Sequence, residues 1–125
     1  MNKALLLVED DPFLSSLLKN RLQKEGFEVI LATDGEQALE LLKTSNVNLV
    51  LLDIILPKKT GFEVLQEIQN NPELRVKELP VIIISNLGQT QDIEKGKEFG
   101  VVEYFIKAKI SIDDLVGKIK DFVNK

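Results

Sequence analysis

The hydrophobic residues of this 125-residue chain fall into short continuous runs separated by longer amphipathic stretches. Four of these runs are Ala4–Val8, Leu49–Leu52, Val81–Ile84 and Val101–Ile106. Continuous rather than alternating apolarity indicates strands that are covered on both faces, as in a parallel sheet. A fifth run, Phe27–Ala32, carries the charged Glu28, which favours a strand at the edge of the sheet.

Between these runs, and after the last one, apolar residues recur at the three- and four-residue spacing of helices. Residues suited to capping a helix precede three of the stretches, at Asp11-Pro12, Asp34-Gly35 and Ser111. A strand followed by a helix, repeated five times, requires right-handed crossovers. The pattern therefore predicts one α/β domain over residues 1–125, a three-layer (βα)5 sandwich.

The stretch from Gln89 to Phe99 is the weakest of the predicted helices. Its large apolar residues are Ile93 and Phe99 alone, and Gly96 lies in its interior. A glycine there costs about 0.5–1 kcal/mol relative to alanine. We expect this segment to be the most mobile element; the alternative is a polar surface helix without a role.

Composition limits the available chemistry to carboxylates, hydroxyls and lysines. The chain has no Cys and no His, which excludes thiol catalysis, disulfides and a histidine base of its own. With 16 Lys+Arg against 20 Asp+Glu, the net charge of −4 argues against direct binding of nucleic acid. No apolar run approaches the roughly 20 residues that span a bilayer, and no signal peptide is recognisable, so we expect a cytoplasmic protein without membrane contact.

Polar side chains follow the predicted strands at their carboxyl ends, where open α/β sheets bind ligands. They are Glu9, Asp10, Asp11, Asp53, Ser85, Asn86 and Lys107. Adjacent carboxylates that face a third one repel each other unless a cation lies among them or their pKa values rise. Because only oxygen ligands are available, we expect that cation to be Mg²⁺ or Mn²⁺.

Two of these acids also have a structural interpretation. Asp11 precedes Pro12, and this pair suits the cap and first position of a helix better than a ligand role. Asp53 on its own could be satisfied by backbone amides. A functional site is favoured because Lys107 ends an apolar strand beside the carboxylates, with which it is expected to pair.

The chain resembles the receiver domains of two-component response regulators over its whole length. The segments that carry the resemblance are Leu6–Asp11, Ala32–Leu39, Asp53–Gly61, Ile83–Ser85 and Tyr104–Lys107. The resemblance implies a flavodoxin-like fold with five parallel strands in the order 2-1-3-4-5. It also implies a switch in a phosphorelay, which assists its own phosphorylation and dephosphorylation but is not an enzyme in the ordinary sense.

By this resemblance Asp53 is the phosphoacceptor, and it takes the phosphoryl group from a phosphohistidine of a sensor histidine kinase or phosphotransfer protein. Lys107 and Ser85 are expected to hold phosphoryl oxygens. Mg²⁺ is the implied cofactor, with ligands from Glu9 through water, Asp10, Asp53 and the backbone carbonyl of Ile55.

The resemblance also implies how the signal leaves the site. Ser85 and Tyr104 are the expected switch residues: Ser85 closes on the phosphate and Tyr104 turns inward. This reshapes the surface formed by the helix Gln89–Phe99, the strand after it and the helix Ile112–Val123, where a downstream protein target would bind.

Three features depart from the family pattern. Ala108 stands where proline usually follows the lysine, and we predict a trans Lys107–Ala108 bond because a cis bond before a non-proline costs about 2.5–4 kcal/mol. Asn86 replaces a small residue and would narrow access to the phosphate. Val101 and Val102 replace a pair of acids; we favour two buried strand residues over an apolar partner contact.

Apolar Ile55 and Leu87 flank the pocket where polar side chains could orient an attacking water, so we hypothesise slow self-dephosphorylation. Alternatives to the switch remain: a receiver-like scaffold that binds partners without phosphorylation, and a Mg²⁺-dependent phosphohydrolase. A nucleotide-binding role is disfavoured because Glu9–Asp11 would repel phosphate. No output domain fits within residues 1–125, so we expect either a free-standing receiver or part of a longer regulator.

Overall fold

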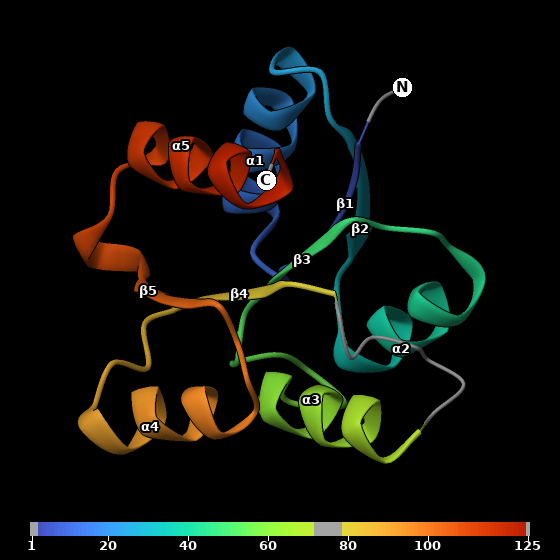
Figure 1. The fold of residues 1–125 in the computed structure, drawn as a ribbon, viewed down its shortest axis with the longest axis vertical. Coiled ribbons are helices and arrows are strands. Elements are labelled where there is room, and N and C mark those ends of the chain that lie inside the picture. Colours follow the sequence, from blue (N-terminus) through green and yellow to red (C-terminus); the bar gives the residue numbers. More distant parts are fainter. Residues whose placement is uncertain (1–2, 72–78, 125) are drawn as a thin grey trace.

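The structure, a computed structural model, describes residues 3–71 and 79–124. Strands and helices alternate along these residues, and Figure 1 labels them in chain order. The strands are β1 (Ala4–Val8), β2 (Glu28–Ala32), β3 (Leu49–Leu52), β4 (Val81–Ser85) and β5 (Glu103–Ile106). The α-helices are α1 (Pro12–Lys24), α2 (Gly35–Thr44), α3 (Gly61–Asn70), α4 (Thr90–Glu98) and α5 (Ile112–Val123).

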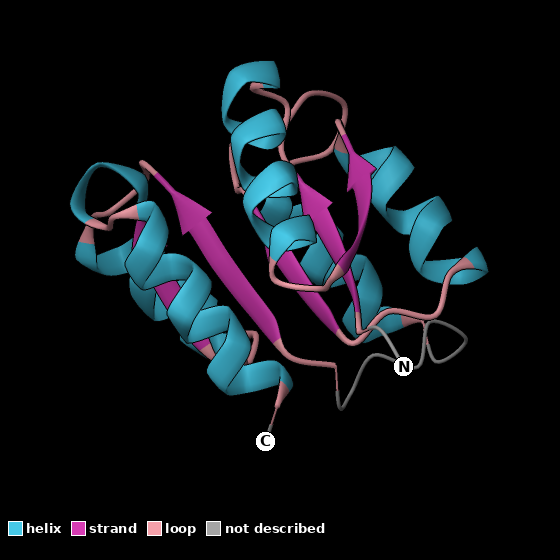
Figure 2. Cartoon of the chain, turned by 90° about the horizontal axis from the view of Figure 1, so that it is seen from above, coloured by secondary structure: helices cyan, strands magenta, loops and turns pink. Residues whose placement is uncertain are grey.

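The strands form one parallel sheet in the order β2-β1-β3-β4-β5. Helices α1 and α5 cover one face, and α2, α3 and α4 cover the other (Figures 1 and 2). The predicted three-layer fold and its strand order are confirmed, including the edge position of β2. From β1 the chain passes to β2 on one side and then to β3 on the other, so the strand order reverses beside β1, which is where such sheets bind ligands.

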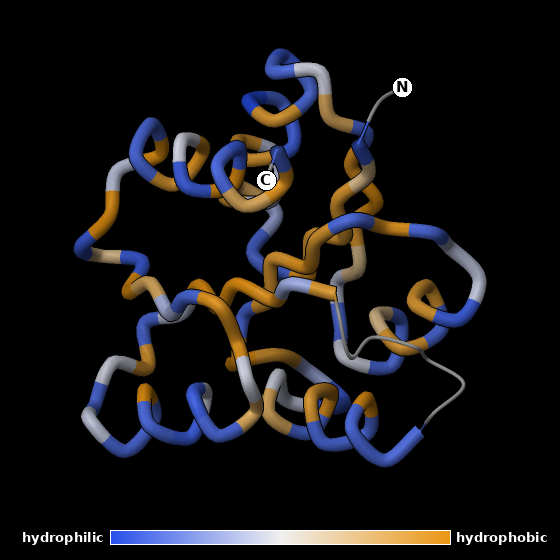
Figure 3. The backbone as a smooth tube through the Cα atoms, viewed as in Figure 1, coloured by the Kyte–Doolittle hydropathy of each residue, from blue (hydrophilic) through white to orange (hydrophobic). Residues whose placement is uncertain are grey.

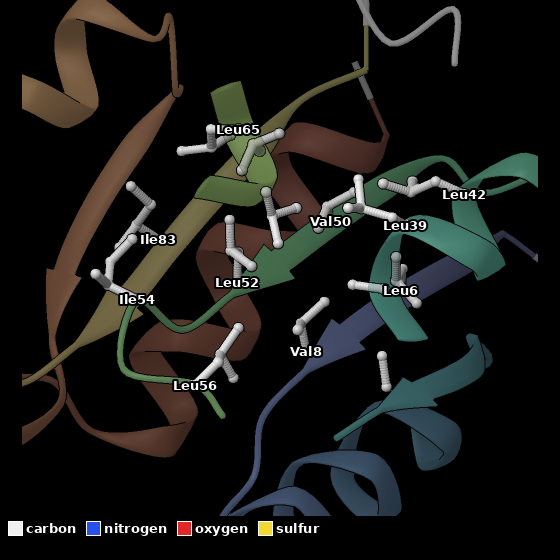
Figure 4. Packing of buried hydrophobic residues seen from close by; sticks show 14 residues of the cluster. Leu6, Val8, Leu39, Leu42, Val50, Leu52, Ile54, Leu56, Leu65 and Ile83 are labelled. Carbon is white, nitrogen blue, oxygen red and sulfur yellow. The ribbon is translucent and has the colours of Figure 1, made fainter. Parts of the chain in front are cut away.

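The core consists of two apolar clusters, one on each face of the sheet. One packs the sheet against α2 and α3 and includes Leu6, Val50, Leu52 and Leu65 (Figure 4). The other packs it against α1 and α5. Strand residues alternate between the two clusters, so the inner strands are hydrophobic throughout their length (Figure 3).

The N-caps expected from the sequence are confirmed. The Asp11 carboxylate accepts hydrogen bonds from the backbone N–H groups of Phe13 and Leu14. Asp34 caps α2 and Ser111 caps α5 in the same way. A further capping box at α3, in which Thr60 and Glu63 exchange hydrogen bonds, was not predicted, although its spacing is visible in the sequence.

The last strand is shorter than predicted. β5 begins at Glu103, and Val102 before it is 40% exposed. The interpretation of both valines as buried strand residues is therefore wrong: neither lies in β5, and Val101 is half-buried and packs against the core. The apolar run misleads here because the chain is still turning out of Gly100, which has a φ of 81°, when it reaches these residues.

Helix α4 has little apolar contact with the rest of the domain, as its composition predicts. Gly96 is its one buried residue. Among all helices in the described ranges, none is long and apolar enough to cross a membrane.

Candidate phosphoryl and metal site

Three carboxylates meet at the carboxyl edge of the sheet. Glu9 and Asp10 follow β1 and Asp53 follows β3, and these strands are paired neighbours. One carboxylate oxygen from each residue lies within 4.8 Å of the other two. Glu9 and Asp53 are buried, whereas Asp10 is exposed, so the cluster opens to solvent on the side of Asp10.

The ammonium group of Lys107 lies between the two buried carboxylates. Its Nζ is 2.7 Å from Asp53 Oδ2 and 2.8 Å from Glu9 Oε1. Burial alone would lower the pKa of Lys107, but the hydrogen bonds to Asp53 and Glu9 outweigh it and raise that pKa. Lys107 is therefore a fixed positive charge at neutral pH. The expected pairing of this lysine with the acids is found in the structure.

Glu9 is in the opposite electrostatic position. Burial raises its pKa, the hydrogen bond from Lys107 opposes this rise, and the nearby charge of Asp53 adds to it. Three carboxylates share one ammonium, so negative charge remains in the cluster when all are ionised. This residual charge and the all-oxygen donor set fit a divalent cation such as Mg²⁺.

The backbone orients these carboxylates. Asp53 Oδ1 accepts a hydrogen bond from the Ile55 N–H at 3.2 Å, and Glu9 Oε2 accepts one from the Asp11 N–H at 3.1 Å. Gly61 returns against the Asp53 backbone so closely that a Cβ there would lie 2.4 Å from the Asp53 carbonyl oxygen. Asp11 caps α1 with its side chain and supports Glu9 with its backbone N–H. It is not part of the three-residue cluster.

Ser85 and Tyr104 are connected through the backbone of Leu87. Ser85 is fully buried, and its Oγ accepts a hydrogen bond from the Leu87 N–H at 3.3 Å. The Tyr104 hydroxyl donates a hydrogen bond to the Leu87 carbonyl. Burial, together with the charges of Asp92 and Asp53, raises the pKa of Tyr104 to about 12, so the hydroxyl stays protonated and able to donate.

The remaining predicted residues lie around the rim. Ile55 is 55% exposed and Leu87 is half-buried, while Asn86 is exposed. The Lys107–Ala108 bond is trans, as predicted, and begins a short 3-10 helix over Lys107–Lys109 that the sequence did not suggest. The metal role of the Ile55 carbonyl and the individual roles of the other site residues stay predictions.

A comparison with known proteins identifies the family. The sequence model of the response regulator receiver domain matches residues 5–120. The chain belongs to the response regulator receiver domain family. This receiver is 42% identical to the transcriptional regulatory protein CpxR of Klebsiella pneumoniae, over 100% of this chain and 50% of that protein. It is 32% identical to the probable transcriptional regulator ycf27 of Cyanophora paradoxa, over 98% of this chain and 49% of that one. The chain thus spans about half the length of these curated relatives.

Solved receiver structures share the fold. The receiver domain of the Francisella response regulator 1452 superposes with a TM-score of 0.88 at 27% identity, covering 98% of each chain. The phosphorylated cyanobacterial phytochrome response regulator RcpA superposes with a TM-score of 0.85 at 30% identity, covering 100% of this receiver and 96% of that chain. The arrangement of strands and helices in this chain is therefore that of a receiver domain.

Two features of the receiver were missed by sequence reasoning. The sequence pointed to Leu87 as a flanking side chain, but its backbone links Ser85 to Tyr104. Gly96 was noticed as a weakness of α4, but it also faces Tyr104. Of these two features, only the one at Gly96 is visible in the sequence, as a glycine in the interior of a predicted helix that no turn or helix end requires.

Proposed function

We propose that this receiver is a phosphorylation-controlled switch whose phosphoacceptor is Asp53. One observation carries the proposal: the buried Asp53 carboxylate lies 2.7 Å from the Lys107 ammonium and shares a cluster with Glu9 and Asp10. A buried carboxylate at the reversal point of the sheet, with an ammonium and further acids around it, has the groups that phosphoryl transfer requires.

In the proposed step an Asp53 carboxylate oxygen attacks the phosphorus of a phosphohistidine on a partner protein. An O–P bond forms, the N–P bond of the donor breaks, and the imidazole nitrogen leaves with the electron pair and takes up a proton. These 125 residues include no histidine, so the phosphohistidine lies outside this domain. A sensor histidine kinase or a phosphotransfer protein supplies that chemistry.

The residues around Asp53 position and neutralise the phosphoryl group. Lys107, already beside Asp53, holds one phosphoryl oxygen, and the buried hydroxyl of Ser85 donates to another. Asp10, Asp53 and the Ile55 carbonyl would hold Mg²⁺, with Glu9 contributing through water. Bound Mg²⁺ would offset the negative charge on the transferred group.

The output of the switch is a change in protein binding. Ser85 is joined to Tyr104 through Leu87, and Tyr104 lies on β5 between α4 and α5. Ser85 Oγ accepts from the Leu87 N–H, so its own O–H can donate to the phosphate. A movement of Oγ toward the phosphate would pull on Leu87 and so affect the α4–β5–α5 surface, to which a downstream protein target binds. Both CpxR and ycf27 are described as transcriptional regulators, and we assign this receiver the control of a protein partner rather than direct contact with nucleic acid.

The proposal is tested by incubating the protein with acetyl phosphate, with and without Mg²⁺, and measuring its intact mass beside Asp53→Asn. We expect a Mg²⁺-dependent gain of one phosphoryl group that is absent in the variant. No gain in the wild type would support the constitutive scaffold instead. Rapid turnover of the donor without accumulation of the phosphorylated protein would support a phosphohydrolase.

A further inference from the structure

Helix α4 approaches the sheet through a residue that has no side chain. Gly96 is buried, and a Cβ built on it would lie 3.1 Å from Tyr104 Cδ2, 3.2 Å from Ile83 Cδ1 and 3.4 Å from Val101 Cγ2. These neighbours come from β5, β4 and the loop between α4 and β5. A methyl group at position 96 would therefore be too close to both Tyr104 and Ile83, and each contact would have to open by a few tenths of an ångström.

Of these two neighbours, Tyr104 can yield further. Ile83 is fully buried in the cluster under α2 and α3, so its displacement would disturb the core. The helix itself is tied to α3 on its other side: Phe99 stacks on Phe62 with ring centroids 6.0 Å apart, and Lys95 Nζ lies 4.6 Å from the centre of the Phe62 ring. These two contacts oppose a movement of α4 away from the sheet as a rigid body.

Tyr104 is half-buried and lies on β5, an edge strand of the sheet, so its ring has an open side. Tyr104 is also among the residues that line a surface groove of about 600 Å³ between β5 and α5, together with Phe105, Ile106, Ile110 and residues of α5. The hydrogen bond from its hydroxyl to the Leu87 carbonyl and its packing under α4 hold the ring inward. A ring displaced by a side chain at position 96 would move toward the open edge of the sheet and lose the bond to Leu87.

We propose that Gly96 is the positioning residue for Tyr104, and that the absence of a side chain at position 96 keeps the ring under α4 with its hydroxyl on Leu87. The size of residue 96 then sets the fraction of time that the Tyr104 ring spends under α4. The consequence for signalling, a shift in the shape of the α4–β5–α5 surface, rests on the proposed function.

The test uses Gly96→Ala beside the matched control Gly117→Ala. Gly117 also lies inside a helix, but a Cβ there meets nothing within 4 Å. Tyr104 is the single tyrosine of a chain without tryptophan, so the intrinsic fluorescence reports on this ring. In Gly96→Ala we expect stronger quenching by acrylamide and loss of the nuclear Overhauser effects between the Tyr104 ring and the Ile83 methyl groups. The control should match the wild type in both measurements.

Unchanged quenching and unchanged Overhauser effects in Gly96→Ala would overturn the inference, and so would equal changes in both variants. A double-mutant cycle in urea gives an independent answer. With Tyr104→Ala as background, Gly96→Ala should change the folding equilibrium constant more favourably than it does with Tyr104 present, because only the tight contact with Ile83 remains; Gly117→Ala should have the same effect in both backgrounds. Equal effects of Gly96→Ala in the two backgrounds would contradict the proposal even if Gly96→Ala alone folds poorly.

Phosphorylation of the same wild-type protein by acetyl phosphate separates this inference from the proposed function. A protein that gains no phosphate, but whose tyrosine responds to Gly96→Ala as expected, would contradict the proposed function and support the role of Gly96. A protein that is phosphorylated, but whose tyrosine does not respond, would overturn the role of Gly96 alone.

Discussion

The Lys107 ammonium lies 2.7 Å from a carboxylate oxygen of Asp53, although the two residues are 54 positions apart in the sequence. The same ammonium lies 2.8 Å from Glu9, so one cation serves two buried carboxylates. A charge taken out of water is tolerated only when it is paired. Lys107 is therefore a structural requirement of the acidic site as well as a candidate ligand for phosphate.

Replacing this lysine should destabilise the fold. In Lys107→Met, Glu9 and Asp53 would remain buried without their shared cation, and we expect a loss of about 2–4 kcal/mol at pH 7. The loss should shrink at acidic pH, where the carboxylates become protonated. The free energy of unfolding in urea measures it.

Lys120→Met is the matched control. Lys120 pairs with Glu25 at 3.0 Å, but both side chains are substantially exposed. Such a pair contributes about 0–1 kcal/mol, so this variant should unfold close to the wild type. Equal losses in the two variants would show that the lysine in the site is not compensating buried charge.

Magnesium should stabilise the folded protein through Asp10. A ligand at about 100 times its Kd stabilises the state that binds it by about 2.7 kcal/mol. We expect a rise in melting temperature with MgCl₂ for the wild type that is largely lost in Asp10→Asn. Asp11→Asn removes one negative charge at the adjacent residue but keeps an effective helix cap, so its melting temperature should still rise with MgCl₂. The metal assignment would be wrong if both variants responded like the wild type.

The loop after β3 contains a strained residue. Lys58 has a φ of 67°, a left-handed conformation that costs a non-glycine residue roughly 1–2 kcal/mol. Lys58→Gly relieves this strain but adds freedom to the unfolded chain, and we expect a net gain of about 0.5–1 kcal/mol. Lys59→Gly, at a neighbouring residue without positive φ, should instead destabilise the protein. Urea unfolding of the two variants compares these signs; a loss in Lys58→Gly would refute the argument.

The lifetime of the aspartyl phosphate should depend on two apolar residues at the rim. Neither Ile55 nor Leu87 offers a polar side-chain atom to orient water beside Asp53. We expect both Ile55→Asn and Leu87→Glu to shorten the lifetime. The Glu carboxylate can act as a general base and should give about a 10-fold effect or more, whereas the Asn amide can only orient the water by hydrogen bonding. The decay of phosphorylated protein after removal of the donor measures this. If the aspartyl phosphate decays no faster in either variant than in the wild type, Ile55 and Leu87 do not control its hydrolysis.

Much of the fold could be predicted because it depends on local pattern and burial. Strands covered on both faces read as continuous apolar runs, and the parallel order then brings Glu9, Asp53 and Lys107 to one edge. The exposure of Val102 could not be predicted, because apolarity alone does not show where a turn ends and strand pairing begins. The Leu87 link and the packing of Gly96 on Tyr104 also escaped, since both depend on distances between elements that no spacing in the sequence encodes.

The central claim is that Asp53, and not one of the acids beside it, accepts the phosphoryl group. Phosphoramidate carries the same N–P bond type as a phosphohistidine, and borohydride reduces an aspartyl phosphate to homoserine, which peptide mass mapping locates. After treatment with phosphoramidate and Mg²⁺, followed by reduction with borohydride, we predict homoserine at position 53. Reduction at position 9, 10 or 11, or unmodified Asp53 in a protein that has gained a phosphate, would contradict the account.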